Sequence, residues 1–181
     1  MKGIVFTEFL EMVEETHGYE MVDTIINKSD LESEGAYTVV GTYPHQEMVA
    51  LISNLSKETQ TPVSKLLYVF GTYLFNTFTS NYKAFFDASD NVFDFFESIE
   101  NYIHVEVLKL YPDAELPSFR TESRTDNNLR MIYSSERKMA DFALGLIESA
   151  LQYYKVDGAV EMERMKEDGS KVLFIITKNN G

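Results

Sequence analysis

The stretch Asn91-Val-Phe-Asp-Phe-Phe-Glu-Ser-Ile-Glu-Asn-Tyr-Ile-His-Val-Glu-Val-Leu-Lys-Leu-Tyr111, followed by Pro112, guides the interpretation of the whole chain. Its apolar residues recur at spacings of three, four and seven, which predicts a helix buried along one face. They are Phe93, Phe96, Ile103, Val107 and Leu110. Pro112 cannot continue a helix and therefore ends it. His104 lies beside the apolar stripe, where a histidine is most often a packed residue and, less often, a metal or haem ligand.

Composition indicates one medium-sized domain that binds neither nucleic acid nor a membrane. A chain of 181 residues fits a single domain, and an aromatic content of 13% suggests a core or pocket lined by rings. The formal net charge is −13, and no basic stripe is visible. Nucleic acids and anionic membrane surfaces both select for basic proteins, so we expect neither as a partner.

Cysteine and histidine content restricts the possible chemistry. The chain has no cysteine, which excludes disulfides, iron–sulfur clusters and thiol nucleophiles. A cage of several histidines would need His17, His45 and His104 to converge from distant segments. The chain has no run of about 20 apolar residues and no secretion signal, and we therefore expect a cytoplasmic protein.

The first half of the chain is predicted to be helical. Amphipathic patterns cover residues 3–16 and 44–58, and a shorter helix lies around residues 22–26. The segment from Thr61 to about Phe78 is apolar on nearly all sides, which marks a central helix. Gly71 lowers the helix propensity inside that segment. We expect the glycine to permit close approach by a neighbouring backbone or a flat ligand.

After Pro112 the apolar pattern changes from helical spacing to alternation. Strands are predicted at 117–124, 128–135, 157–165 and 171–178, with a helix at 137–154 and a hairpin turn at Asp168-Gly169. The sequence therefore predicts an α+β fold, with helices packed on a small four-stranded antiparallel sheet. We interpret residues 1–181 as one domain with a helical N-terminal subdomain, 1–60, and a C-terminal subdomain, 61–181.

A group of polar residues follows the second predicted strand. Tyr133 and Ser135 share one face of an extended segment, and Arg137 continues the same spacing. Arginine binds a carboxylate through two parallel hydrogen bonds, and the two hydroxyls can satisfy the remaining lone pairs. The alternative is structural: Ser134 or Ser135 caps the following helix, and Arg137 is exposed.

With these features in place, the chain resembles the haem nitric oxide/oxygen binding (H-NOX) domains, which are related to the sensor domain of soluble guanylate cyclase. The likeness spans nearly the whole chain. It is carried by the opening Met1-Lys-Gly, by His104-Val-Glu-Val-Leu-Lys-Leu-Tyr-Pro112, by Tyr133-x-Ser135-x-Arg137, and by Arg-Lys-Met139 followed by Leu-Gly-Leu-Ile-Glu148. A histidine 29 residues before the tyrosine motif makes the combination specific.

The resemblance implies a haem b buried between the two subdomains. His104 would be the proximal ligand of the iron, a role for which neutral imidazole is suited. Tyr133, Ser135 and Arg137 would bind the two propionates. Pro117 would press on the ring and distort it.

The resemblance also implies a distal gas pocket. Its lining would consist of Val5, Phe9, Leu74, Phe78, Ala140 and Leu144. Members that hold dioxygen stably place a tyrosine where this chain has Ala140. Bound dioxygen carries negative charge and is stabilised by a hydrogen-bond donor, whereas nitric oxide binds ferrous iron strongly without one. Tyr73 neighbours Leu74 but should point elsewhere, because adjacent helical residues diverge by about 100°.

The expected function is a haem-based sensor of nitric oxide, which also binds carbon monoxide, and not an enzyme. Release of the iron–His104 bond would switch a partner, in bacterial members usually a histidine kinase or a diguanylate cyclase. One alternative is a haem enzyme, such as a peroxidase or a nitric oxide dioxygenase, which usually needs a polar distal acid or base. The other is an interaction domain without haem, in which His104 is simply packed.

Overall fold

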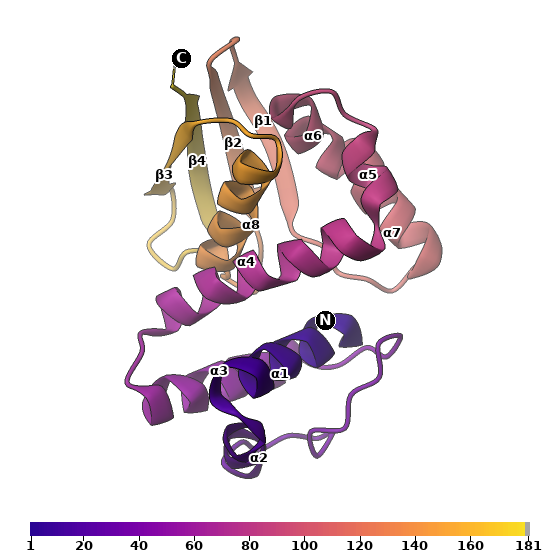
Figure 1. Ribbon diagram of the computed structural model, residues 1–181, viewed down its shortest axis with the longest axis vertical. Coiled ribbons are helices and arrows are strands. Elements are labelled where there is room, and N and C mark those ends of the chain that lie inside the picture. The colour runs from indigo at the N-terminus through magenta and orange to yellow at the C-terminus, as the bar shows by residue number, and fades with distance from the viewer. Residues whose placement is uncertain (180–181) are drawn as a thin grey trace.

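The structure is a computed structural model and describes residues 1–179. Three helices form the N-terminal part and lie together on one side of the long helix α4 (Figure 1). They are α1 (Gly3–His17), α2 (Tyr19–Asn27) and α3 (His45–Thr59). The loop between α2 and α3 returns to the start of the chain, where the Gly3 amide donates to Gly41 O. The predicted helices of this region are confirmed.

Helix α4 (Val63–Asn81) separates this layer from the rest of the molecule (Figure 1). It crosses helix α8 (Ala140–Tyr153) at two glycines. A Cβ atom on Gly71 would lie 2.2 Å from the Phe142 carbonyl oxygen, and one on Gly145 would lie 2.2 Å from the Tyr68 carbonyl oxygen. The expected close approach at Gly71 is thus confirmed, and the neighbour is the backbone of α8.

The C-terminal part is built on a four-stranded antiparallel sheet with strand order β1-β2-β4-β3. Its strands are β1 (Ser118–Arg124), β2 (Asn128–Ser134), β3 (Gly158–Arg164) and β4 (Lys171–Lys178). Helix α8 covers one face of the sheet (Figure 1), where Ala143, Ile147 and Ala150 pack with Met131 and Phe174. The predicted α+β architecture is confirmed.

The helix expected from Asn91 to Tyr111 is interrupted. It begins as α6 (Val92–Ser98), passes through a π-helical turn, η1 (Ile99–Ile103), and continues as α7 (His104–Leu110). A short helix, α5 (Lys83–Asp87), precedes it. The wide turn alters the helical register, so the apolar stripe does not run unbroken. Leu110, expected on the buried face, is 67% exposed.

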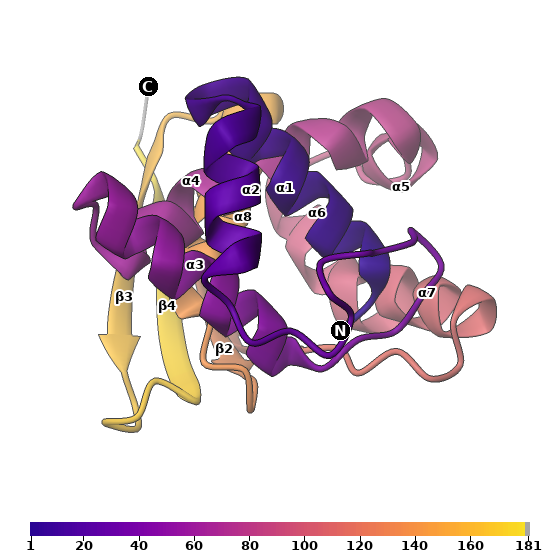
Figure 2. The same cartoon turned by 90° about the horizontal axis from the view of Figure 1, so that it is seen from below.

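Two hydrophobic clusters fill the molecule, and α4 contributes to both. The first contains α1, α2, α3 and the first half of α4, together with Met139. The second contains the sheet, α6, α8 and Phe75 of α4. The interpreted subdomain boundary at residue 60 lies between α3 and α4. Seen from below, the N-terminal helices α1, α2 and α3 lie nearest the viewer (Figure 2).

Candidate functional site

His104 is positioned by the π-helical turn that precedes it. Its backbone amide donates to Ile99 O, five residues earlier, and this bond closes the turn. Single π-helical turns within longer helices are frequent at functional sites because they re-aim a side chain. The imidazole side chain is 15% exposed. Burial lowers the pKa of His104 below its usual value, and the carboxylate of Glu100 acts in the opposite direction.

The surroundings of His104 connect it to the sheet. Glu100 Oε2 lies 3.3 Å from His104 Nδ1, and the imidazole ring lies 6.1 Å from the ring of Phe119 on β1. The Phe119 ring in turn lies 5.4 Å from the ring of Tyr133 on β2. His104 and Tyr133 are therefore joined through one aromatic side chain. Because Glu100 engages Nδ1, the atom left for a metal is Nε2.

The three residues of the tyrosine motif lie at the end of β2 and in the turn after it. Tyr133 is 3% exposed, and burial raises its pKa, while Ser135, the Met139 backbone and the charge of Arg137 act against that rise. Ser135 Oγ accepts a hydrogen bond from the Arg137 amide at 3.2 Å. Helix α8 begins at Ala140, too far along the chain for Ser135 to cap it.

Arg137 is not the exposed side chain of the structural alternative. Its side chain is 15% exposed, and Nη2 lies 3.4 Å from Glu115 Oε2. Glu115 is itself 82% exposed. This contact is long and lies at the surface, so the guanidinium remains available to another carboxylate.

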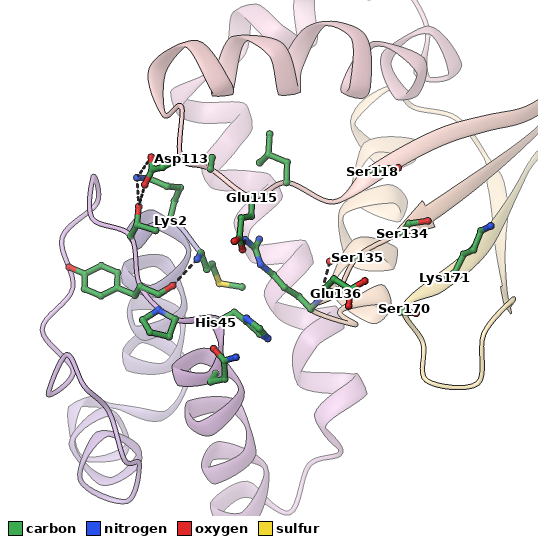
Figure 3. A pocket seen from close by; sticks show the side chains of 18 of the residues that line it. Lys2, His45, Asp113, Glu115, Ser118, Ser134, Ser135, Glu136, Ser170 and Lys171 are labelled. Atoms are coloured by element: carbon green, nitrogen blue, oxygen red, sulfur yellow. Dashed lines mark hydrogen bonds and ion pairs between the residues drawn. The ribbon is translucent and has the colours of Figure 1, made fainter.

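Ser135 and Arg137 line a cavity of about 910 Å³ at the junction of the two halves of the molecule. Figure 3 shows His45, from the N-terminal helices, across the hollow from Ser135 and Glu136. Leu116 and Ser118 also line the cavity, so it passes Pro117, which lies between them in the chain. Lys2 and Asp113 close one side, joined by an ion pair of 3.4 Å (Figure 3).

Four residues of the expected distal pocket come together. Phe9 and Leu74 are fully buried in the first cluster, and Val5 and Phe78 are half-buried against it. The Phe9 ring contacts the Phe70 ring edge-on at 5.2 Å. These side chains are all apolar, as the sequence predicted for a pocket without a hydrogen-bond donor.

The other two expected residues, Ala140 and Leu144, lie four residues apart on α8 and pack in or against the second cluster. Phe78 packs against both clusters and therefore connects the two sets of residues. Leu144 also lines a shallow surface hollow with Tyr68 and Glu148. The assignment of Ala140 and Leu144 to the distal pocket stays a prediction.

Phe142 is a residue of α8 that packs against the first cluster. Its ring lies 5.1 Å from the ring of Phe70, which also contacts Phe9. The carbonyl of Phe142 lies at the crossing with Gly71.

The remaining candidate residues do not add a polar group to the distal cluster. Burial and then the charges of Glu11 and Glu15 raise the pKa of Tyr73 to about 12, which places its hydroxyl near the acidic side of α1. His17 is exposed at the end of α1. His45 is half-buried and lines the cavity at the beginning of α3.

The arrangement fits a haem. A mostly buried imidazole has its Nδ1 held by a carboxylate, which is the arrangement found for histidine metal ligands. Arg137, Ser135 and Tyr133 lie together next to a cavity, and the exposed carboxylate of Glu115 occupies the position of an acidic partner of Arg137. Within residues 1–179 no group of three or more His, Asp or Glu side chains is arranged to hold a metal ion. In the same range, no helix has the length and apolarity needed to cross a membrane.

The fold is similar to that of solved H-NOX proteins. The H-NOX protein from K. algicida, solved in its Fe(II) unliganded state, is 46% identical; the match has a TM-score of 0.97 and covers 100% of this chain and 98% of that one. The H-NOX protein from S. oneidensis in the Fe(II)NO ligation state is 25% identical, with a TM-score of 0.90 and coverage of 99% and 100%.

An animal protein is also similar in sequence to this chain. Soluble guanylate cyclase gcy-33 of Caenorhabditis elegans is 24% identical over 182 residues, which cover 98% of this chain. The chain spans about a fifth of that protein's length, 19%. A family model described as Haem-NO-binding matches residues 2–163. The chain therefore belongs to the Haem-NO-binding family, the H-NOX domains.

Proposed function

We propose that this domain senses nitric oxide through a haem b whose iron is held by His104. The observation that carries the proposal is the placement of His104: its imidazole is mostly buried, its Nδ1 is engaged by Glu100, and Phe119 links it to Tyr133. A ferrous haem, when bound, supplies the iron to which a diatomic gas binds.

The polar residues next to the cavity hold the cofactor's carboxylates in this proposal. Arg137 offers two parallel N–H donors, and Ser135 and Tyr133 offer hydroxyls. Because burial raises the pKa of Tyr133, its phenol stays protonated and can donate a hydrogen bond. Pro117, next to the cavity, is the residue we assign to distortion of the ring.

Selectivity for nitric oxide follows from the apolar side chains on the opposite side. In this proposal Val5, Phe9, Leu74 and Phe78 form this surface together with Ala140 and Leu144 of α8. None of these six side chains has a hydrogen-bond donor. A hydrogen bond to a charged acceptor contributes about 1.5–3 kcal/mol, so dioxygen loses roughly tenfold or more in affinity. Nitric oxide and carbon monoxide do not depend on such a donor.

Release of His104 would transmit binding to the rest of the domain. Helix α7, which begins at His104, is followed by Asp113, and Asp113 accepts hydrogen bonds from Thr42 at 2.6 Å and Lys2 at 3.4 Å. Movement of α7 is therefore coupled to the first residues of the chain and to the loop before α3. A ligand changes such an equilibrium only by binding one state better than the other, and loss of the His104 contact provides that difference.

The signal then passes to a separate signalling activity. We infer a histidine kinase or a diguanylate cyclase as the partner, as the resemblance to bacterial H-NOX domains implies. The relative gcy-33 is itself a cyclase, in which the matching region is a small part of the chain. A peroxidase or dioxygenase is disfavoured because the distal side chains named above have no acid or base.

The decisive experiment replaces His104 by Ala and measures haem content. We expect haem to be lost and to be restored by free imidazole, which occupies the vacated position. Replacing the half-buried His45 by Ala provides a matched control, because it removes a histidine near the cavity that we do not assign to the iron. Equal haem retention in H104A and wild type would overturn the assignment.

A further inference from the structure

Glu100 contacts both the imidazole of His104 and the backbone of β1. It lies in the π-helical turn, four residues before His104, and its Oε2 is 3.3 Å from His104 Nδ1. The same oxygen accepts a hydrogen bond from the backbone amide of Phe119 at 3.0 Å. One carboxylate oxygen therefore joins the imidazole to the beginning of β1.

The contact with Phe119 fixes the direction of the carboxylate. The Glu100 side chain is 44% exposed, and an exposed carboxylate held by one partner alone would sample many rotamers. A backbone amide on a paired strand is a rigid donor, since Phe119 is opposite Tyr133 in the sheet. The carboxylate is thereby held toward the imidazole although it is partly in solvent.

A carboxylate on Nδ1 affects a histidine ligand in two ways. It keeps the proton on Nδ1, so that Nε2 presents its lone pair to the metal, and it raises the basicity of the ring. A more basic ring binds iron more strongly. Since the proposed signal requires that this bond break, the carboxylate determines how readily nitric oxide releases His104.

We propose that Glu100 is a positioning residue that sets the strength of the bond between His104 and the haem iron, and with it the rate at which nitric oxide releases that bond. This inference rests on the proposed function. Glu100 acts through His104 and Phe119 and is not itself a ligand. The side chain also bridges the π turn and β1, so the test must separate an effect on the iron from an effect on folding.

Two substitutions and one control make that separation. Glu100→Gln keeps an oxygen acceptor of the same length but removes the charge. Glu100→Leu removes both hydrogen bonds. Glu106→Gln removes a charge two residues after His104 on α7, where Glu106 pairs with Lys109 at 2.6 Å and not with the imidazole. Circular dichroism and thermal melting of each variant establish that it is folded.

The measurement is the iron–histidine stretching band in the resonance Raman spectrum of the ferrous, unliganded holoprotein. We expect Glu100→Gln to lower its frequency, Glu100→Leu to lower it at least as much, and Glu106→Gln to leave it unchanged. In stopped-flow mixing with nitric oxide, conversion of the six-coordinate to the five-coordinate nitrosyl should become roughly fivefold faster in Glu100→Gln, because a charge-assisted hydrogen bond is about twice as strong as a neutral one.

The outcomes distinguish the inference from the function on which it rests. A wild-type protein without haem, or with haem but no iron–histidine band, would refute the assignment of His104. A wild-type band that is unchanged in Glu100→Gln, with an unchanged conversion rate, would refute the role of Glu100 alone. An equal shift in Glu106→Gln would also refute it, since it would show a general effect of charge. If Glu100→Leu does not fold, Glu100→Gln decides.

Discussion

Replacing Ala140 by Tyr should give this domain a stable complex with dioxygen. The substitution adds one hydroxyl in the cluster against which Phe78, another predicted pocket residue, is packed. Phe142 lies two residues further along α8, where the side chain has turned by about 200°, and its ring packs on that of Phe70, 5.1 Å away between centroids. Phe142→Tyr is therefore the matched control: it adds the same hydroxyl on another face of the helix.

The expected magnitude follows from the donor and its surroundings. A hydrogen bond to the negatively charged oxygen contributes about 1.5–3 kcal/mol, which corresponds to a gain of roughly 10- to 150-fold in dioxygen affinity. The buried hydroxyl of either variant has lost water in the unliganded state, so each substitution should also lower the free energy of unfolding by about 1 kcal/mol.

Dioxygen and nitric oxide titrations of the reduced proteins, followed by absorption, test this prediction. We expect Ala140→Tyr to remain oxygenated in air and its nitric oxide affinity to change by less than the dioxygen affinity. An unchanged dioxygen affinity in an Ala140→Tyr variant that retains its haem would refute the placement of Ala140 in the distal pocket. Tight dioxygen binding by Phe142→Tyr, and not by Ala140→Tyr, would show that another face of α8 lines the pocket.

Three further predictions concern the crossing of α4 and α8, the proposed propionate-binding Arg137 and the buried Tyr154. Gly145→Ala should lower the free energy of unfolding by about 1–3 kcal/mol, because its Cβ would lie 2.2 Å from the Tyr68 carbonyl oxygen; an unchanged melting temperature would contradict the tight crossing. The Arg137→Ala variant should lose haem to apomyoglobin roughly tenfold faster than wild type. The control is Arg130→Ala, because Arg130 pairs with Glu122 on the sheet and should not affect the rate. Equal rates for Arg137→Ala and wild type would contradict a role of Arg137 in holding the propionates. Burial raises the pKa of Tyr154 to about 12, above the unfolded value of 10. The stability that the protonated phenol contributes is therefore complete below pH 10 and is lost as the pH rises toward 12. Between about pH 9 and pH 12 the free energy of unfolding should fall less for Tyr154→Phe than for wild type, and equal decreases in denaturation experiments would contradict this.

Most of the fold could be predicted because local patterns determine it. The helices of the N-terminal part and the four strands follow from apolar spacing, and the hairpin follows from Asp168-Gly169, where Gly169 has a φ of 75°. The π turn before His104 could not be predicted, since Ile99 to Ile103 have ordinary helical spacing. Its stabilisation depends on contacts with a distant strand, such as the Glu100 carboxylate on the Phe119 amide.

The candidate site also has a part that follows from local sequence and a part that does not. Tyr133, Ser135 and Arg137 could be grouped because they are close in the chain, and in the structure they lie near one another. The predicted distal lining combines α1, α4 and α8, which are distant in the chain, and its assignment stays a prediction. The face of α8 that meets α4 is set by two glycines at a crossing, Gly71 and Gly145, and not by periodicity within α8 alone.

The absorption spectrum of the reduced wild-type protein in air, before and after addition of nitric oxide, tests the central claim most directly. We predict a haem protein whose ferrous spectrum is unchanged by air and which becomes a five-coordinate nitrosyl when nitric oxide is added. A stable oxygenated spectrum, or a nitrosyl that stays six-coordinate with His104 still bound, would contradict the account.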